Sequence, residues 1–235
     1  MKRVLLAWSS GKDCSWALHL LRQQPGIEVA ALLTTLNEAV DAVAMHHVPR
    51  PLIELQARAA GLPLWTVPLP WPCLNETYET RMAEACARAR AEGIHAVAFG
   101  DLFLKDVRAY RERMLAPTGL EPLFPLWGLD TRALAHEMVA AGQRALVTTI
   151  DPRRLPATFC GRDFDEGFLA SLPPEIDPCG ENGEFHTFVH QSPAFAHAIP
   201  CQPGETIELN GFVYTALRPA GPTGLSPAPS GSSRT

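Results

Sequence analysis

The segment VLLAWSSGKDCSWALHLL, residues 4–21, decides the fold of this 235-residue chain. Its first five residues form a short apolar run that is typical of a buried strand, and the run stops at Ser9-Ser10-Gly11. From residue 12 onward, apolar residues recur three and four positions apart, which indicates one face of a helix. Pro25-Gly26 ends this helix, and a second apolar run follows at residues 27–36. The beginning of the chain therefore predicts a β-α-β unit.

The alternation of strands and helices continues through the first 150 residues. Further strands are expected at residues 64–69, 94–99 and 145–150, and further helices at residues 52–60, 82–89, 105–115 and after the capping residue Asp130. Because parallel strands need crossover connections, this order predicts an α/β fold with a doubly wound, mostly parallel sheet covered on both faces. Ligands of such sheets bind at the carboxyl ends of the strands.

The alternation stops at residue 151, where proline and glycine become frequent. Two short strands at residues 206–209 and 211–217 are joined by a tight turn at Asn210-Gly211, which is typical of a hairpin. The last 17 residues contain 11 Pro, Gly or Ser residues, a composition with too little apolar surface to fold. We therefore expect a domain over residues 1–150, a smaller C-terminal α+β lobe over residues 151–218, and a disordered tail over residues 219–235.

The composition argues against several classes of protein. The chain has 20 Lys and Arg residues against 25 Asp and Glu residues, and the net charge of −5 provides no general basic field for nucleic acid. No apolar run approaches the roughly 18 residues of a membrane span, and the N-terminus becomes polar too early for a signal peptide. The six cysteines are far apart and include no C-x-x-C pair. These features predict a cytoplasmic protein with reduced thiols, with neither nucleic acid nor a membrane as a partner.

The loop Ser9-Ser10-Gly11-Lys12-Asp13-Cys14 predicts an anion-binding site, because it lies where a strand leads into a helix. There the backbone N–H groups and the positive end of the helix face the same point. Gly11 allows close approach of the backbone, the serines donate hydrogen bonds, and Lys12 supplies an ammonium group. The acid beside the lysine suits a metal-bound pyrophosphate. The alternative is a plain turn whose small polar residues only cap the helix.

A second candidate segment is DPCGENGEFHTFV, residues 177–189. Its glycines and carboxylates suit a ligand-facing loop that leads into a strand. Glu184 and His186 are two positions apart, so in an extended segment they project to the same side and can handle a proton together. The alternative is a polar loop that only covers the sheet.

Three further residues are candidates because of their position. Asp101 follows the strand expected at residues 94–99, where it can hold Mg²⁺ or cap the next helix. Arg108 and Arg111 lie three positions apart on the helix expected at residues 105–115. They can clamp an anionic substrate or form part of a solvated charged face.

These segments resemble those of a known family. The loop at residues 9–14 resembles the S-G-G-K-D-S loop of the ATP pyrophosphatases, the nucleotide α-hydrolase group. The run CGENGEFHTFV resembles the hallmark of the diphthine–ammonia ligase family, and similar segments at residues 45–49, 100–111, 123–128 and 161–165 extend the resemblance over roughly residues 1–215. Two loop positions depart from the pattern. Ser10 replaces a glycine, a mild change if its φ is negative, and Cys14 replaces a serine with a weaker hydrogen-bond donor.

The resemblance implies a nucleotide α-hydrolase-like fold and an AMP-forming carbon–nitrogen ligase. Such an enzyme adenylates a carboxylate with ATP, releases pyrophosphate and transfers the acyl group to ammonia. The implied cofactors are ATP and Mg²⁺. The implied nucleotide-binding residues are Ser9, Ser10, Gly11, Lys12, Asp13, Cys14, Leu36, Gly100 and Asp101, the implied catalytic residues are Glu181, Glu184 and His186, and the implied metal ligand is Asp101.

The resemblance also implies the partners of the reaction, which are ammonia and a carboxylate on a small molecule or on a protein. Diphthine, the family's substrate, is a modified histidine of translation elongation factor 2. A homodimer is left open. Two alternative functions remain, namely a related ATP pyrophosphatase that acts on another small molecule or on tRNA, and a non-catalytic nucleotide-binding module.

Overall fold

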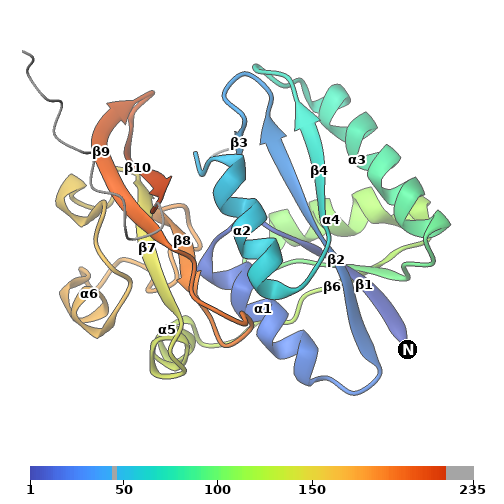
Figure 1. Cartoon of the computed structure of the whole chain (residues 1–235), viewed down its shortest axis with the longest axis horizontal. Coiled ribbons are helices and arrows are strands. Elements are labelled where there is room, and N and C mark those ends of the chain that lie inside the picture. Colours follow the sequence, from blue (N-terminus) through green and yellow to red (C-terminus); the bar gives the residue numbers. More distant parts are fainter. Residues whose placement is uncertain (44–46, 221–235) are drawn as a thin grey trace, which may run out of the picture.

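The computed structural model describes residues 1–43 and 47–220, and this part contains two β-sheets and six α-helices (Figure 1). The two sheets, A and B, lie side by side in the view of Figure 1. Pro219, the first residue of the expected tail, still belongs to the last strand. Residues 221–235 of that tail, and residues 44–46, lie outside the described residues.

Sheet A is the mostly parallel sheet that the alternating pattern predicts. It consists of β1 (Lys2–Ala7), β2 (Ile27–Asn37), β3 (Ala42–Val43), β4 (Leu64–Leu69), β5 (Ala96–Ala98) and β6 (Glu121–Leu123). The strand order is β3-β2-β1-β5-β6, and β4 also pairs with β2. Only the short β3 runs antiparallel to its neighbour among these described strands. The predicted α/β class is therefore confirmed.

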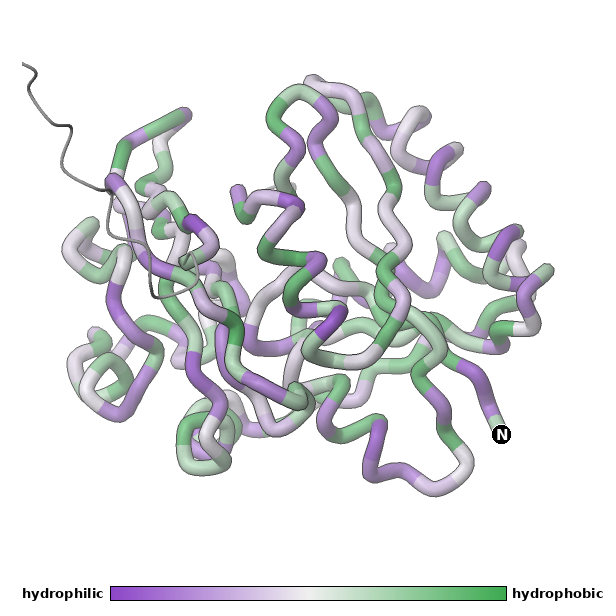
Figure 2. Tube along the Cα trace, viewed as in Figure 1, coloured by the Kyte–Doolittle hydropathy of each residue, from purple (hydrophilic) through white to green (hydrophobic). Residues whose placement is uncertain are grey.

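Helices cover both faces of sheet A. They are α1 (Lys12–Gln23), α2 (Arg50–Ala60), α3 (Asn75–Ala91) and α4 (Lys105–Leu115). Leu5 and Leu6 are adjacent in β1, so they point to opposite faces, and each is completely buried in a different hydrophobic cluster. The centre of sheet A is mainly hydrophobic (Figure 2). Burial of each leucine side chain contributes about 1.5–3 kcal/mol to the stability of the fold. The cluster around Leu6 includes α1 and α2, and that around Leu5 includes α3 and the end of α4.

Sheet B corrects one part of the prediction. It consists of β7 (Arg144–Ile150), β8 (Phe185–Gln191), β9 (Cys201–Leu209) and β10 (Phe212–Pro219), in the order β8-β7-β10-β9. The expectation that residues 145–150 close the parallel series is wrong, because β7 pairs antiparallel with β8 and β10. Both partners lie far along the chain, where local periodicity carries no information. The domain boundary at residue 150 stays a prediction.

The remaining elements are short. The helices α5 (Thr131–Ala140) and α6 (Glu166–Ser171) and the 3₁₀ turn at Ala157–Phe159 belong to the part of the chain that contains sheet B, whereas the 3₁₀ turn at Ala116–Thr118 follows α4 and contacts α3. Asp130 caps α5 as expected, since its Oδ1 accepts a hydrogen bond of 2.7 Å from the Ala133 amide. Among the described residues, no helix has the length and apolar character needed to cross a membrane.

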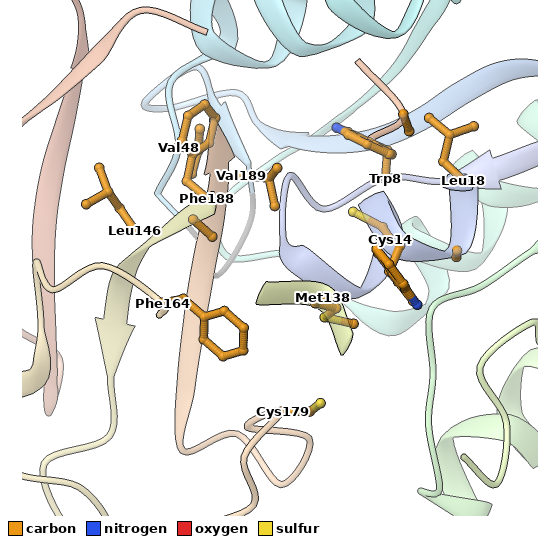
Figure 3. Close-up of a cluster of buried hydrophobic side chains, with 14 of the residues drawn as sticks. Trp8, Cys14, Leu18, Val48, Met138, Leu146, Phe164, Cys179, Phe188 and Val189 are labelled. Atoms are coloured by element: carbon orange, nitrogen blue, oxygen red, sulfur yellow. The ribbon is translucent and has the colours of Figure 1, made fainter. Parts of the chain in front are cut away.

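The N-terminal part (β1 to β6) and the C-terminal part (α5 to β10) share one hydrophobic cluster. Figure 3 shows Trp8 and Cys14, from the first β-α unit, in the same cluster as Phe188 and Val189 from β8. The backbones also meet directly, because the Val189 amide donates a 3.0 Å hydrogen bond to the Ser10 carbonyl. The strand-to-helix loop of the N-terminal part is therefore fixed by the C-terminal part.

Candidate functional site

The loop between β1 and α1 contains a strained backbone position. The replacement of the family's glycine by Ser10 was expected to be mild if the φ of Ser10 were negative. The φ of Ser10 is 77°, so this condition is not met. This left-handed conformation costs a non-glycine residue about 1–2 kcal/mol. The side chain is completely buried, and its hydroxyl has no hydrogen-bond partner among the described residues. Ser10 is therefore a buried donor held in a strained position beside the start of α1.

Lys12 is buried between the two parts of the chain. Its side chain is only 3% exposed, and its ammonium lies 2.9 Å from Asp13 Oδ2 and donates to the Cys179 carbonyl. The ammonium also lies over the Phe185 ring, 5.3 Å from the centroid. Burial by itself lowers the pKa of Lys12, but the neighbouring acids, above all Asp13, raise it, so that the net change is upward. Lys12 is therefore a buried cation in the folded protein.

The two side chains after Asp13 point away from the loop's amide groups. The Cys14 thiol donates to the Gly11 carbonyl over 3.1 Å, and burial raises its pKa to about 11. The Ser15 hydroxyl donates to Ser192 Oγ over 2.8 Å and so belongs to the contact with the C-terminal part. Ser9 and Asp13 keep partial exposure, whereas Gly11 is buried beneath β8.

The loop of residues 177–184 lies over the start of α1. Glu181 Oε1 accepts hydrogen bonds from the amides of Leu102 (2.7 Å) and Phe103 (3.4 Å). Burial is the main cause that raises the pKa of Glu181 to about 7, and the charges of Asp13 and Asp101 raise it further. The hydrogen bond from the Leu102 amide lowers this pKa and so opposes the shift. Glu181 thus brings a carboxylate that titrates near neutral pH to this site.

Glu184 and His186, expected to act as a pair, lie in different environments. Glu184 is completely buried, with its Oε1 3.0 Å from Asn182 Nδ2 and 3.3 Å from Arg154 Nη2, and its Oε2 has no hydrogen-bond partner among the described residues. Burial, followed by the charge of Lys12, lowers the pKa of His186 to about 4. His186 is therefore neutral at pH 7. The joint handling of a proton stays a prediction.

Gly100 and Asp101 follow β5, and Gly100 lies against the backbone at the start of α1. A Cβ atom on Gly100 would lie 3.0 Å from the Cys14 nitrogen, so only glycine lets the two backbones approach this closely. Asp101 Oδ2 lies 3.6 Å from Arg111 Nε, beyond hydrogen-bond distance. Burial raises the pKa of Asp101, against a smaller lowering by Arg111.

The donor set fits a Mg²⁺ ion that is shared with phosphate groups. Asp13 Oδ1 and Asp101 Oδ2 are buried carboxylate oxygens without hydrogen-bond partners among the described residues, and oxygen ligands are what Mg²⁺ prefers. The described part of the chain contains no group of three or more acidic, His or Cys side chains placed to hold a metal ion. An ion at Asp101 or Asp13 would therefore complete its shell with water and phosphate oxygens.

Two other candidates have packing roles in the structure. Leu36, which the resemblance implied as a nucleotide-binding residue, is 1% exposed and belongs to the hydrophobic core near the end of β2. The Arg108 guanidinium lies over the rings of Phe124 (4.8 Å) and Trp127 (4.7 Å) and bonds to Glu112. Neither side chain shows a contact with the loop at residues 9–14 among the described interactions.

Sequence reasoning missed the buried residues that hold the site together. Gln56 of α2 accepts from Trp8 Nε1 (2.8 Å) and donates to the carbonyls of Ser10 (3.0 Å) and Val189 (2.7 Å). The Thr187 hydroxyl accepts from the Lys12 amide, and Gln143 donates to the Lys12 carbonyl, both over 3.1 Å. Gln56 did leave a signal, because it is a polar residue within the apolar stripe of its helix.

Comparisons with known proteins agree with this architecture. Residues 1–122 match the family model of the diphthamide synthase N-terminal domain, and residues 130–214 match that of the C-terminal domain. Among curated relatives, the Schizosaccharomyces pombe diphthine–ammonia ligase is 25% identical over 226 residues, which cover 88% of this chain but only 37% of the yeast protein.

Two vertebrate relatives with the same name match over most of their length. The Bos taurus protein is 24% identical over 237 residues, covering 92% of this chain and 88% of the relative. The Danio rerio protein is 26% identical over 225 residues, which cover 87% of this chain and 88% of the relative. Since the two family models together match most of the sequence, the chain belongs to the diphthamide synthase family.

Proposed function

We propose that this chain is an ATP-dependent ligase that joins ammonia to a carboxylate and releases AMP and pyrophosphate. The observation that supports it best is the meeting of two distant segments at Lys12, residues 9–14 and 177–189. The relatives that match are named diphthine–ammonia ligases, so a carboxylate on a protein or on a small molecule is the substrate class. We extend the proposal to a cytoplasmic location.

The N-terminal loop supplies the groups for the phosphates. In the proposed reaction, the Lys12 ammonium turns from the Cys179 carbonyl to the departing pyrophosphate and stabilises the charge that develops there. The Ser10 hydroxyl is already buried without a partner among the described residues and can donate to a phosphate oxygen. Asp13 and Asp101 would hold Mg²⁺, which neutralises phosphate charge when it is bound. Gly100 keeps Asp101 close to the start of α1.

The C-terminal loop supplies the base. Only neutral ammonia attacks the acyl-adenylate, so ammonium must first give a proton to a base, and a base works best when its pKa lies near the working pH. Glu181, with a pKa raised to about 7, meets this condition, and the ion-paired Glu184 is the second candidate. His186, with a pKa lowered to about 4, is neutral at this pH and is a weaker base than Glu181.

The test follows the oxygen atoms of the carboxylate. The protein is incubated with Mg-ATP, ammonium and a panel of carboxylates labelled with heavy oxygen, and the products are analysed by mass spectrometry. Attack of the carboxylate on the α-phosphorus places one labelled oxygen in AMP. Labelled AMP together with pyrophosphate and an amide supports the proposal, whereas ADP and phosphate, unlabelled AMP, or nucleotide binding without turnover contradicts it.

The base is identified with matched variants. Glu181→Gln and Glu184→Gln are compared with Glu175→Gln, which changes an exposed glutamate nearby. Loss of a general base lowers the rate by about a hundredfold or more. We expect this loss in Glu181→Gln together with loss of the rate increase near pH 7, and a normal rate in Glu175→Gln. A Glu184→Gln variant that alone loses the pH dependence would assign the base to Glu184.

A further inference from the structure

A cavity of about 410 Å³ lies between α3 and α4, on the face of sheet A opposite α1 and α2. Its wall is formed mainly by apolar side chains of both helices and of the end of β5. These are Met82, Cys86, Phe99, Met114 and Leu115. The volume is in the range of small-molecule sites, and flexible methionines adapt their shape to a ligand. The walls therefore suit the hydrocarbon body of a small molecule.

Two arginines of α4, Arg111 and Arg113, line this cavity, and Arg111 is the one that lies beside Asp101. Its guanidinium stacks on the Phe99 ring at 4.9 Å, and its side chain is 30% exposed. Within residues 1–43 and 47–220, the buried Nε of Arg111 has no hydrogen-bond partner at 3.5 Å or less. Asp101, at 3.6 Å, balances its charge without satisfying its donors. A planar fork of five donors is suited to a carboxylate.

The cavity is connected to the candidate site through Arg111 and Asp101. Asp101 contributes to the raised pKa of Glu181, and the preceding Gly100 touches the backbone at Cys14. A carboxylate held by Arg111 would therefore lie beside the acidic groups that face the start of α1. Glu79 lines the same cavity and opposes negative charge on the ligand, so a ligand with one carboxylate, paired with Arg111, is favoured over one with two.

We propose that this cavity binds a monocarboxylic acid with an aliphatic or aromatic body, and that Arg111 holds its carboxylate. The assignment of this acid as the substrate that is amidated rests on the proposed function. The binding itself does not, because the cavity and Arg111 are in place without a nucleotide. This makes an acid–amide pair the decisive probe, since the amide keeps the shape and loses the charge.

The test measures binding of hydrocinnamate and of its neutral amide, hydrocinnamide, by calorimetry without ATP. We expect the acid to bind at least about tenfold more tightly than the amide, because a charged hydrogen bond is stronger than a neutral one. Arg111→Met abolishes this preference. The matched control is Arg88→Met, because Arg88 stacks over Trp65 and does not line this cavity, and we expect it to retain the preference. Equal affinities in the unmodified protein, or no saturable binding of either probe, overturn the proposal.

A second variant tests the cavity without removing Arg111. Ala83 lines the cavity from an exposed position of α3, so Ala83→Phe fills space without disturbing the core. We expect both probes to lose affinity at least about tenfold while thermal unfolding is unchanged. Unchanged affinity in Ala83→Phe overturns the location of the site, even if Arg111→Met folds poorly.

A final arm separates this inference from the proposed function. Mg-ATP and ammonium are added to the protein with saturating hydrocinnamate, and AMP is measured. If the acid binds at Arg111 but no AMP forms with any carboxylate, the proposed acid-binding cavity is supported and the proposed ligase activity is contradicted. AMP formed with other carboxylates at the same rate in Arg111→Met supports the ligase and overturns the cavity as its substrate site.

Discussion

Ser10 combines a left-handed backbone with a buried hydroxyl that has no partner among the described residues. Replacement by glycine removes the backbone strain of about 1–2 kcal/mol, and the greater freedom of glycine in the unfolded chain offsets about 0.5–1 kcal/mol of this gain. We expect Ser10→Gly to raise the free energy of unfolding by about 1 kcal/mol, measured by urea denaturation. The control is Ser9→Gly, at the neighbouring position where φ is not positive, and we expect it to lower the free energy of unfolding. A less stable Ser10→Gly protein would show that the serine is not strained.

Glu181 makes the stability of the fold depend on pH. Its pKa is 4.5 in the reference state and about 7 in the folded protein, mainly because of burial. Between these values the folded chain holds a proton that the unfolded chain has released, so the free energy of unfolding falls as pH rises from about 4.5 to about 7. We expect Glu181→Gln to lessen this fall in denaturation curves recorded across this range. Glu175→Gln, at an exposed site, keeps the original profile, and an identical profile in Glu181→Gln would contradict the raised pKa.

At the scale of elements, α2 holds the junction through one side chain. Gln56 is completely buried and makes hydrogen bonds to groups of the loop before α1 and of β8. Gln56→Leu keeps the size but leaves Trp8 Nε1 without its partner, at about 1–3 kcal/mol, and removes one hydrogen bond each from the carbonyls of Ser10 and Val189. The Ser10 carbonyl still accepts from the Val189 amide. We expect the free energy of unfolding to fall by about 2–4 kcal/mol, measured by urea denaturation. The control is Gln23→Leu, which changes an exposed glutamine at the end of α1, and an equal fall in both variants would contradict the role of Gln56.

The same junction shows which elements local sequence can predict. The β1-α1-β2 unit and the cap at Asp130 follow from periodicity and capping over a few residues, and the structure has them. The place of β7 depends on strands 35 or more positions later, and a residue pattern in β7 does not name its partners. The loop residues 9–14 stood out for similar local reasons. The raised pKa of Glu181 depends on Asp13 and Asp101, which only the folded chain brings near it.

At the scale of the whole molecule, the proposed nucleotide site belongs to both parts of the chain. The Lys12 amide is bonded to Thr187, and the Val189 amide to Ser10, so opening of the junction exposes both amides. A ligand that binds only the closed form stabilises it by about 2.7 kcal/mol at a hundred times its Kd. This corresponds to roughly hundredfold slower exchange of amides that become accessible through that opening.

We therefore expect Mg-ATP to slow hydrogen exchange of the Lys12 and Val189 amides together, measured by NMR or by mass spectrometry of short peptides. The amide of Thr206, in the β9–β10 hairpin, is the internal control, because β9 pairs only with β10 among the described strands. Asp13→Asn, which keeps the side-chain shape but removes a charge from the expected ion site, reduces the protection. Protection confined to α1 would mean that the nucleotide contacts the N-terminal part alone, and that β8 is only a structural support for the loop.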